Sequence, residues 1–189
     1  MVTLCIENSA QLGSVALMSD GDLLVEKTFA NIRGRGTGLF KTLTELVTAD
    51  IALDRVIVGN GPGSYNALRA SISAGWGIAR ARGVPVLGVC SLLGYDQTGY
   101  CVVGDARAGQ WFFARVCSGV LADGPRLIAP LDLPHIADAA IFSTSELPHL
   151  LDATIRCPLA SLLERHAESA SIAAPIYLKP PHITSPSPR

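Results

Sequence analysis

The sequence predicts an α/β protein made of two copies of one unit, in which helices cover a mixed sheet. The first half has the pattern of three strands followed by a helix, a strand, a second helix and another strand, an order typical of mixed sheets. The strand pattern begins again near Tyr100, with Asp105 in the place of Glu7 and Gly119 in the place of Gly21. The chain has 189 residues, of which 49% are hydrophobic, so it is large enough to bury a sizeable core without disulfides.

The elements of the first half follow from hydrophobic periodicity and from turn residues. Ser19-Asp20-Gly21 predicts a tight turn between two strands, and Gly83 predicts the end of a helix that Ser64 begins. A glycine-rich basic segment at 31–38, with Arg33 and Arg35, precedes the first helix. Strands are predicted at 2–7, 13–18, 22–29, 55–58 and 84–89, and helices at 39–47 and 64–82.

The second half is predicted to be a shorter version of the first. Strands are expected at 101–105, 110–117, 126–128 and 139–142, and a helix at about 158–166. We therefore divide the chain into a first lobe, residues 1–98, and a truncated second lobe, residues 99–189. The last ten residues, 180–189, hold four prolines and are expected to form a mobile tail.

Composition excludes several classes of protein. The formal net charge is -1, so no global positive field attracts nucleic acid, and any contact with tRNA is expected to be indirect. The five cysteines show no C-x-x-C spacing and the four histidines form no helical i, i+4 pair, so we expect reduced thiols, no metal and no cofactor. No apolar run approaches the length of a membrane span, and a cytoplasmic location is expected.

Two features could hold a nucleotide, and each has a simpler structural explanation. The glycine-rich turn with Gly61, Gly63 and Ser64 lies between a buried strand and a helix N-terminus, where an anion is favoured, yet it matches neither the Walker A loop nor the dinucleotide fingerprint. Glu7 and Asp105 each end a strand, where a carboxylate can hold magnesium beside a phosphate or can simply form a turn. The residues alone leave both alternatives open.

Four blocks of sequence resemble the TsaB family, also called YeaZ. They are the glycine-rich turn with its following arginine (58–69), the Gly-Val-Pro strand that ends in Ser91-Leu92 (83–92), the Asp105-Ala106-Arg107 turn, and the terminal Pro-x-Tyr-Leu-Lys stretch (175–179). They occur in the order of the family and span nearly the whole chain. The resemblance implies an actin-like ATPase (ASKHA) fold of two duplicated RNase H-like lobes with mixed sheets, of which the second is truncated.

The resemblance also implies a function without chemistry of its own. TsaB-like proteins dimerise with the catalytic paralogue TsaD, which places threonylcarbamoyl on tRNA adenosine next to the anticodon. TsaD carries a metal-binding pair of histidines in its first half, whereas no histidine precedes His135 here. In the family the first loop begins Asp-Thr-Ser, and Glu7 replaces that aspartate. We therefore expect no catalytic residue and a vestigial nucleotide site at Glu7, Gly61, Gly63, Ser64 and Asp105.

The alternative from another class is an enzyme of the same fold. It would be an ATP-dependent phosphotransferase or ATPase, with the turn from Gly61 to Ser64 and Asp105 around the nucleotide and Glu7 on magnesium. Mg-ATP turnover by the isolated chain would separate this enzyme from a scaffold.

A docking face is predicted on the two helices of the first lobe. In the second helix, Tyr65, Leu68, Ile72, Trp76 and Ala79 form a bulky stripe that suits the sheet beneath. A stripe of smaller residues beside it allows close approach of another helix. The predicted contact residues, for a TsaD-like partner or for a second copy in a homodimer, are Leu39, Leu43, Ala67, Ser71, Ala74 and Ile78. The alternative is that this stripe packs on the first helix within the same chain.

Overall fold

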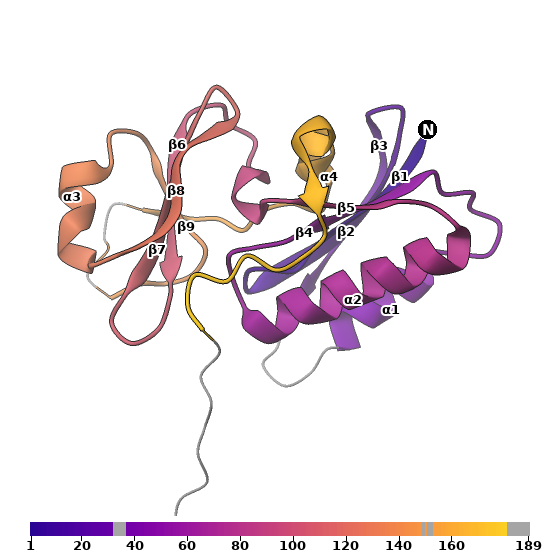
Figure 1. The fold of residues 1–189 in the computed structure, drawn as a ribbon, viewed down its shortest axis with the longest axis horizontal. Coiled ribbons are helices and arrows are strands. Elements are labelled where there is room, and N and C mark those ends of the chain that lie inside the picture. The colour runs from indigo at the N-terminus through magenta and orange to yellow at the C-terminus, as the bar shows by residue number, and fades with distance from the viewer. Residues whose placement is uncertain (32–36, 149, 151–152, 181–189) are drawn as a thin grey trace, which may run out of the picture.

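The computed structural model describes residues 1–31, 37–148, 150 and 153–180, and its first sheet is built mainly from the first half of the chain (Figure 1). Strands β1 (Val2–Glu7), β2 (Leu12–Ser19) and β3 (Asp22–Ala30) form an antiparallel meander. Strands β4 (Arg55–Gly59) and β5 (Val86–Val89) extend the sheet parallel to β1. With β11 (Ser171–Ile172) at the far edge, the strand order is β11-β5-β4-β1-β2-β3.

The second sheet repeats the first. Its strands are β6 (Tyr100–Asp105), β7 (Trp111–Cys117), β8 (Val120–Ile128), β9 (Ile141–Ser143) and β10 (Thr154–Ile155), in the order β10-β9-β6-β7-β8. β6, β7 and β8 are antiparallel neighbours and β9 is parallel to β6, as in the first copy. Order and polarity therefore confirm the predicted duplication.

The two copies also share the turn between their second and third strands. Asp20 and Gly21 have φ values of 51° and 88°, and Ser118 and Gly119 have φ values of 51° and 75°. Two successive residues with positive φ are typical of the two-residue hairpin turn that matches strand twist. The predicted correspondence between Gly21 and Gly119 is thus a correspondence of backbone conformation.

The helices distinguish the two copies. In the first lobe α1 (Thr37–Leu46) and α2 (Tyr65–Arg82) cover one face of the sheet, and Gly83 ends α2 with a φ of 68° (Figure 1). In the second, the β8–β9 connection holds the 3-10 turn η2 (Pro130–Asp132) and the single helical turn α3 (Leu133–Ile136). No helix occurs among the described residues between β9 and β10. The second lobe is therefore truncated, as predicted.

The C-terminal part of the chain returns to the first sheet. Helix α4 (Ala160–Leu163) and the 3-10 helix η3 (Glu164–Ser169) lie on the face opposite α1 and α2 (Figure 1). The Ala160 amide donates to the Ser14 hydroxyl at 2.8 Å, and the Ser161 hydroxyl donates to the Glu26 carboxylate at 2.6 Å. The boundary at 98/99 stays a prediction, because residues assigned to the second lobe complete the sheet of the first.

Two large cores follow from this arrangement. One lies between the first sheet and its two helices and includes Leu4, Leu43 and Ile72. The other lies between the two lobes and joins Cys5 and Ile57 of the first sheet to Tyr100, Phe112 and Leu163. The 3-10 turn η1 (Ser91–Leu93) links the lobes and buries all three of its residues.

Several local predictions need correction. The strand expected at 126–128 is the longer β8, whose pairing with β7 begins at Val120, is interrupted at Gly124-Pro125 and resumes at Arg126. The helix expected at 158–166 is one turn of α-helix followed by 3-10 helix. Ser64 stands at the start of α2 but its hydroxyl makes no capping hydrogen bond.

Other predictions fall partly outside the described residues. They concern Arg33 and Arg35 of the basic segment, His149 and His182, and the proline-rich tail beyond Pro180. Among the described residues, no helix is long and apolar enough to cross a membrane.

Candidate functional site

Glu7, which only the alternative ATPase hypothesis places on magnesium, is enclosed by the protein. It ends β1 beside the end of β4, and its side chain has no solvent exposure. One carboxyl oxygen accepts a hydrogen bond from the Ser9 amide at 2.6 Å, while the other has no partner. A methyl group at Gly59 would lie 1.7 Å from that second oxygen, so only glycine leaves room for it. Burial raises the pKa of the Glu7 carboxyl and so favours its neutral form.

The glycine-rich turn uses its backbone groups for internal contacts. The Gly61 amide donates to the Ser91 hydroxyl at 2.9 Å, and the Ser64 amide donates to the Ser9 carbonyl at 2.8 Å. Pro62 has no amide hydrogen to offer. A methyl group at Gly63 would lie 2.3 Å from the Ser9 carbonyl oxygen, which shows how closely the two loops approach. Of the two alternatives that the sequence left open, this geometry favours a structural turn.

Four of the five predicted nucleotide residues lie close together, and the fifth, Asp105, lies apart from them. Gly61, Gly63 and Ser64 gather around the loop that follows Glu7. Asp105 belongs to the second lobe, where it is exposed and forms a tight turn by accepting the Arg107 amide at 2.7 Å. The Arg107 guanidinium lies 3.2 Å from the same carboxylate. The contacts of Asp105 are therefore made within its own turn.

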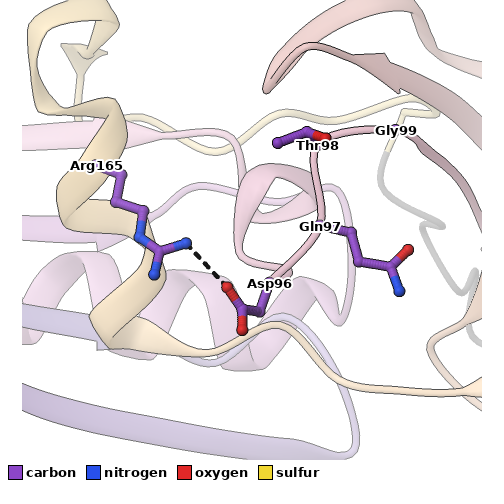
Figure 2. A pocket seen from close by; sticks show the side chains of 5 residues that line it. All are labelled: Asp96, Gln97, Thr98, Gly99 and Arg165. Atoms are coloured by element: carbon purple, nitrogen blue, oxygen red, sulfur yellow. Dashed lines mark hydrogen bonds and ion pairs between the residues drawn. The ribbon is translucent and has the colours of Figure 1, made fainter.

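A polar hollow of about 400 Å³ lies where the link between the lobes meets η3 (Figure 2). Its lining is Asp96, Gln97, Thr98, Gly99 and Arg165. The Asp96 carboxylate and the Arg165 guanidinium form an ion pair at 3.0 Å, and both side chains are more than 60% exposed. Because its charges pair with each other in water, we assign no ligand to this hollow. The described residues also contain no group of three His, Cys, Asp or Glu side chains able to hold a metal.

An apolar groove of about 360 Å³ runs between α1 and α2 on the outer surface. Phe40 is 53% exposed beside it, although it is a large apolar side chain. Three predicted contact residues, Leu43, Ala74 and Ile78, are among those that line the groove. The full lining is Phe40, Leu43, Thr44, Val47, Ala74, Gly77 and Ile78.

The other three predicted contact residues lie elsewhere. Leu39, Ala67 and Ser71 are buried in the chain itself, at 2%, 7% and 0% exposure. Ala67 and Ser71 lie on a part of α2 that faces the protein, and Leu39 of α1 belongs to the core between the first sheet and its helices. Leu43 lines the groove but is itself only 6% exposed, so the docking prediction depends mainly on the partly exposed Ala74 and Ile78.

Two glycines of α2 show which face is open. A methyl group at Gly75 would lie 2.5 Å from the Val58 side chain of the sheet, whereas one at Gly77 would meet nothing within 4 Å. Gly77 is a groove residue that the sequence analysis missed. Its spacing of three from Ala74 was the available signal, since small residues at i and i+3 form one helical surface.

Comparison with known proteins adds to this geometry. Residues 39–122 match a family model described as "TsaD: tRNA N6-adenosine threonylcarbamoyltransferase". An uncharacterized protein of Mycobacterium tuberculosis (strain ATCC 25618 / H37Rv) is 42% identical over 84 residues, which are 43% of this chain and 40% of that protein. An uncharacterized protein of Mycobacterium leprae (strain TN) is 40% identical over 97 residues, which are 48% of this chain and 27% of that protein. The matched part thus spans at most 40% of the length of these relatives.

The fold similarity extends much further than the sequence similarity. YeaZ from Pseudomonas aeruginosa superposes with a TM-score of 0.68 at 24% identity, covering 94% of this chain and 99% of that chain. A second solved structure, an uncharacterized protein with similarity to peptidase YEAZ from the same organism, gives the same values. The chain therefore shares the fold of the solved YeaZ structure, and this agrees with the resemblance of its sequence to the TsaB (YeaZ) family.

Proposed function

We propose that this chain is a non-catalytic TsaB-like subunit that supports a TsaD-like catalytic paralogue in threonylcarbamoyl modification of tRNA adenosine. It dimerises with that paralogue through the groove between α1 and α2, and it forms a homodimer through the same face when alone. The observation that carries the proposal is the open apolar groove around Ala74 and Gly77, next to the half-exposed Phe40. An exposed apolar surface with small residues at its floor suits another helix.

Two observations favour a subunit without chemistry over an ATPase. The Glu7 carboxyl is fully buried with a raised pKa, so it is a poor ligand for hydrated magnesium. The glycine-rich turn commits its Gly61 and Ser64 amides to Ser91 and Ser9. Contact with tRNA is left to the partner, in keeping with the net charge of -1.

The experiment compares two arginine substitutions, one inside the groove and one next to it. In Ala74→Arg the side chain extends over the groove into water, so the chain folds, but a helix can no longer approach. Ser73→Arg is the matched control, because Ser73 is exposed and is not a groove residue. We expect both variants to melt near the temperature of the parent. Only Ala74→Arg should be a monomer when its mass is measured by light scattering. Only Ala74→Arg should also fail to co-purify with a co-expressed TsaD-like protein.

Two results would contradict the proposal. One is an Ala74→Arg variant that still forms both complexes, which would move the docking face elsewhere. The other is Mg-ATP turnover by the isolated parent chain, which would make it an enzyme. If Ala74→Arg failed to fold, Gly77→Gln would take its place, since the space above Gly77 is empty in the chain.

A further inference from the structure

The segment from Ala173 to Lys179, which we call the strap, crosses from the first lobe to the second (Figure 1). It follows β11 at the edge of the first sheet and ends beside the turn after β6. The proposed function uses no residue of the strap. Its contacts nevertheless touch both loops that the sequence analysis weighed as nucleotide loops.

On the first lobe the strap is held at three points. The Trp76 indole donates to the Ala173 carbonyl at 3.0 Å, and the Ile176 amide donates to the Asn60 carbonyl at 2.8 Å. The Tyr177 ring stacks on Tyr65 with centroids 4.9 Å apart. Asn60 and Tyr65 flank the glycine-rich turn on either side, so the strap spans that turn.

On the second lobe one lysine makes the connection. The Lys179 ammonium donates to the carbonyls of Ala106 and Arg107 at 2.9 and 2.8 Å. Arg107 and Ala108 have φ values of 66° and 53°, a conformation that residues other than glycine rarely adopt. The two charge-assisted hydrogen bonds stabilise the carbonyl orientation of this turn. Next to Lys179, Leu178 packs against the core between the lobes.

We propose that the strap is a built-in peptide link between the two lobes, which takes the place of a ligand that would bridge the glycine-rich turn and the turn after β6. Through the Ile176 amide and the Lys179 ammonium, it joins the residue that follows β4 to the turn that follows β6. These contacts within the chain fix the orientation of one lobe relative to the other. No bound phosphate ligand is needed for this. A ligand that bridged the two loops would have to displace Lys179.

Hydrogen exchange measured by mass spectrometry on the full chain tests the proposal, with Lys179→Met as the first variant. We expect exchange to accelerate about 10-fold both in the strap and in the 105–110 turn, as for the loss of charge-assisted hydrogen bonds. Lys179→Arg should retain protection in both segments. Lys41→Met is the matched control. The Lys41 side chain on α1 is exposed, and its ammonium makes only a long contact, 4.0 Å, with Glu45.

Tyr177→Ser tests the same link from the first-lobe side, and because Tyr177 is 42% exposed the substitution is compatible with folding. It too should accelerate exchange in the 105–110 turn, although Tyr177 makes its stacking contact with Tyr65 of the first lobe. Acceleration confined to one of the two segments in both variants would overturn the proposal.

Addition of Mg-ATP to the parent chain provides the second arm. We expect no change in hydrogen exchange in the strap or in the 105–110 turn. The reason is that the strap already binds the groups that a bridging ligand would contact. A change in both segments would overturn the proposal by showing that the strap is displaced. Neither arm involves a partner protein, so failure here is distinguishable from failure of the docking proposal.

Discussion

At the scale of single residues, Glu7 is the most informative position. A carboxyl group with no solvent exposure and one unpaired oxygen is costly to ionise. Its neighbour Gly59 provides the space that the second oxygen occupies. The Glu7 side chain is thus part of the packing at the end of β1. Ionisation of its carboxyl group should make the stability of the chain depend on pH.

The sign of that dependence follows from the direction of the pKa shift. Burial raises the Glu7 pKa in the folded state above its unfolded value, so folding favours the protonated form. The contribution to stability is fully present below the unfolded pKa and is lost as pH rises through the folded pKa. Glu7→Gln removes the ionisation, and we expect the free energy of unfolding of the variant, relative to the parent, to increase between pH 4 and pH 7.

Urea unfolding of both proteins at the two pH values measures this change. Glu168→Gln is the control, because Glu168 is exposed on η3. A difference between Glu7→Gln and the parent that stays constant with pH would show that Glu7 titrates alike in the folded and unfolded chains.

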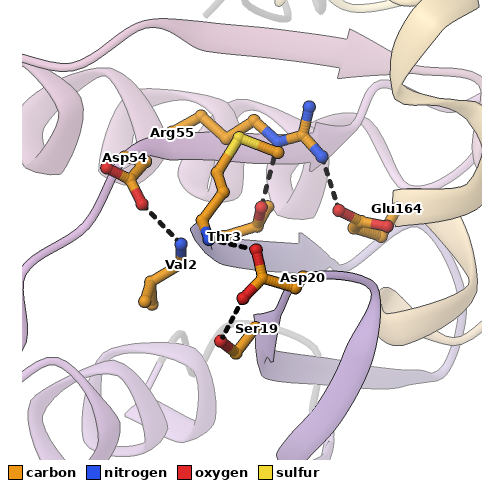
Figure 3. Close-up of polar contacts among 8 residues, drawn as sticks. Val2, Thr3, Ser19, Asp20, Asp54, Arg55 and Glu164 are labelled. Carbon is orange, nitrogen blue, oxygen red and sulfur yellow. Dashed lines mark hydrogen bonds and ion pairs between the residues drawn. The ribbon is translucent and has the colours of Figure 1, made fainter.

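At the scale of elements, polar contacts fix the C-terminal segment on the first sheet. The Arg55 guanidinium on β4 pairs with Glu164 of η3 and also donates to the Thr3 hydroxyl at 2.9 Å (Figure 3). The two charged side chains are only 18% and 12% exposed. A pair so enclosed depends on both partners, because a single remaining charge is left poorly solvated.

Arg55→Met should therefore destabilise the chain by about 1–3 kcal/mol, the usual cost of a buried charged group that loses its hydrogen bond. The double variant Arg55→Met/Glu164→Gln should recover most of this loss, since no charge is left unpaired. Arg165→Met is the matched control: its pair with Asp96 is exposed and is expected to contribute at most ~1 kcal/mol. Equal losses in the two arginine variants by urea unfolding would contradict the assignment.

Local pattern predicted the elements where local physics determines them. The strands of both meanders and the span of α2 follow from periodicity and from Gly83, which takes the left-handed conformation at the helix end. The short helix α4 follows from contacts distant in sequence, since Ser14 and Glu26 bind its first amide groups. No signal within 158–166 indicates those contacts.

The candidate site was predicted in part for the same reason. Helical spacing placed Tyr65 and Trp76 on the sheet face of α2, but they are 37% and 47% exposed. Gly75 takes the inner position, because the helix approaches Val58 too closely for a larger side chain. The two aromatic residues instead contact the strap, a segment about a hundred positions later in the chain.

At the scale of the whole molecule, the lobes share one core. Cys5, Ala16 and Ile57 of the first sheet pack against residues from the second lobe and from α4. We therefore expect a fragment of residues 1–98 to expose that face, to bind a hydrophobic dye and to melt without a cooperative transition. Differential scanning calorimetry of the fragment and of the full chain makes the comparison. A cooperative transition of the fragment would show that the first lobe is an independent folding unit.

The unequal helices of the two copies have a consequence for assembly. Of the duplicated units, the first alone presents a long helical pair among the described residues, so the proposed docking face occurs once on each chain. Complexes built through a single self-complementary patch close after two members, and a third subunit finds no free patch. A second copy of this chain and the proposed TsaD-like partner would then compete for the same docking face. The relative abundance of the two proteins, together with their affinities, would determine how much of this chain is engaged in modification.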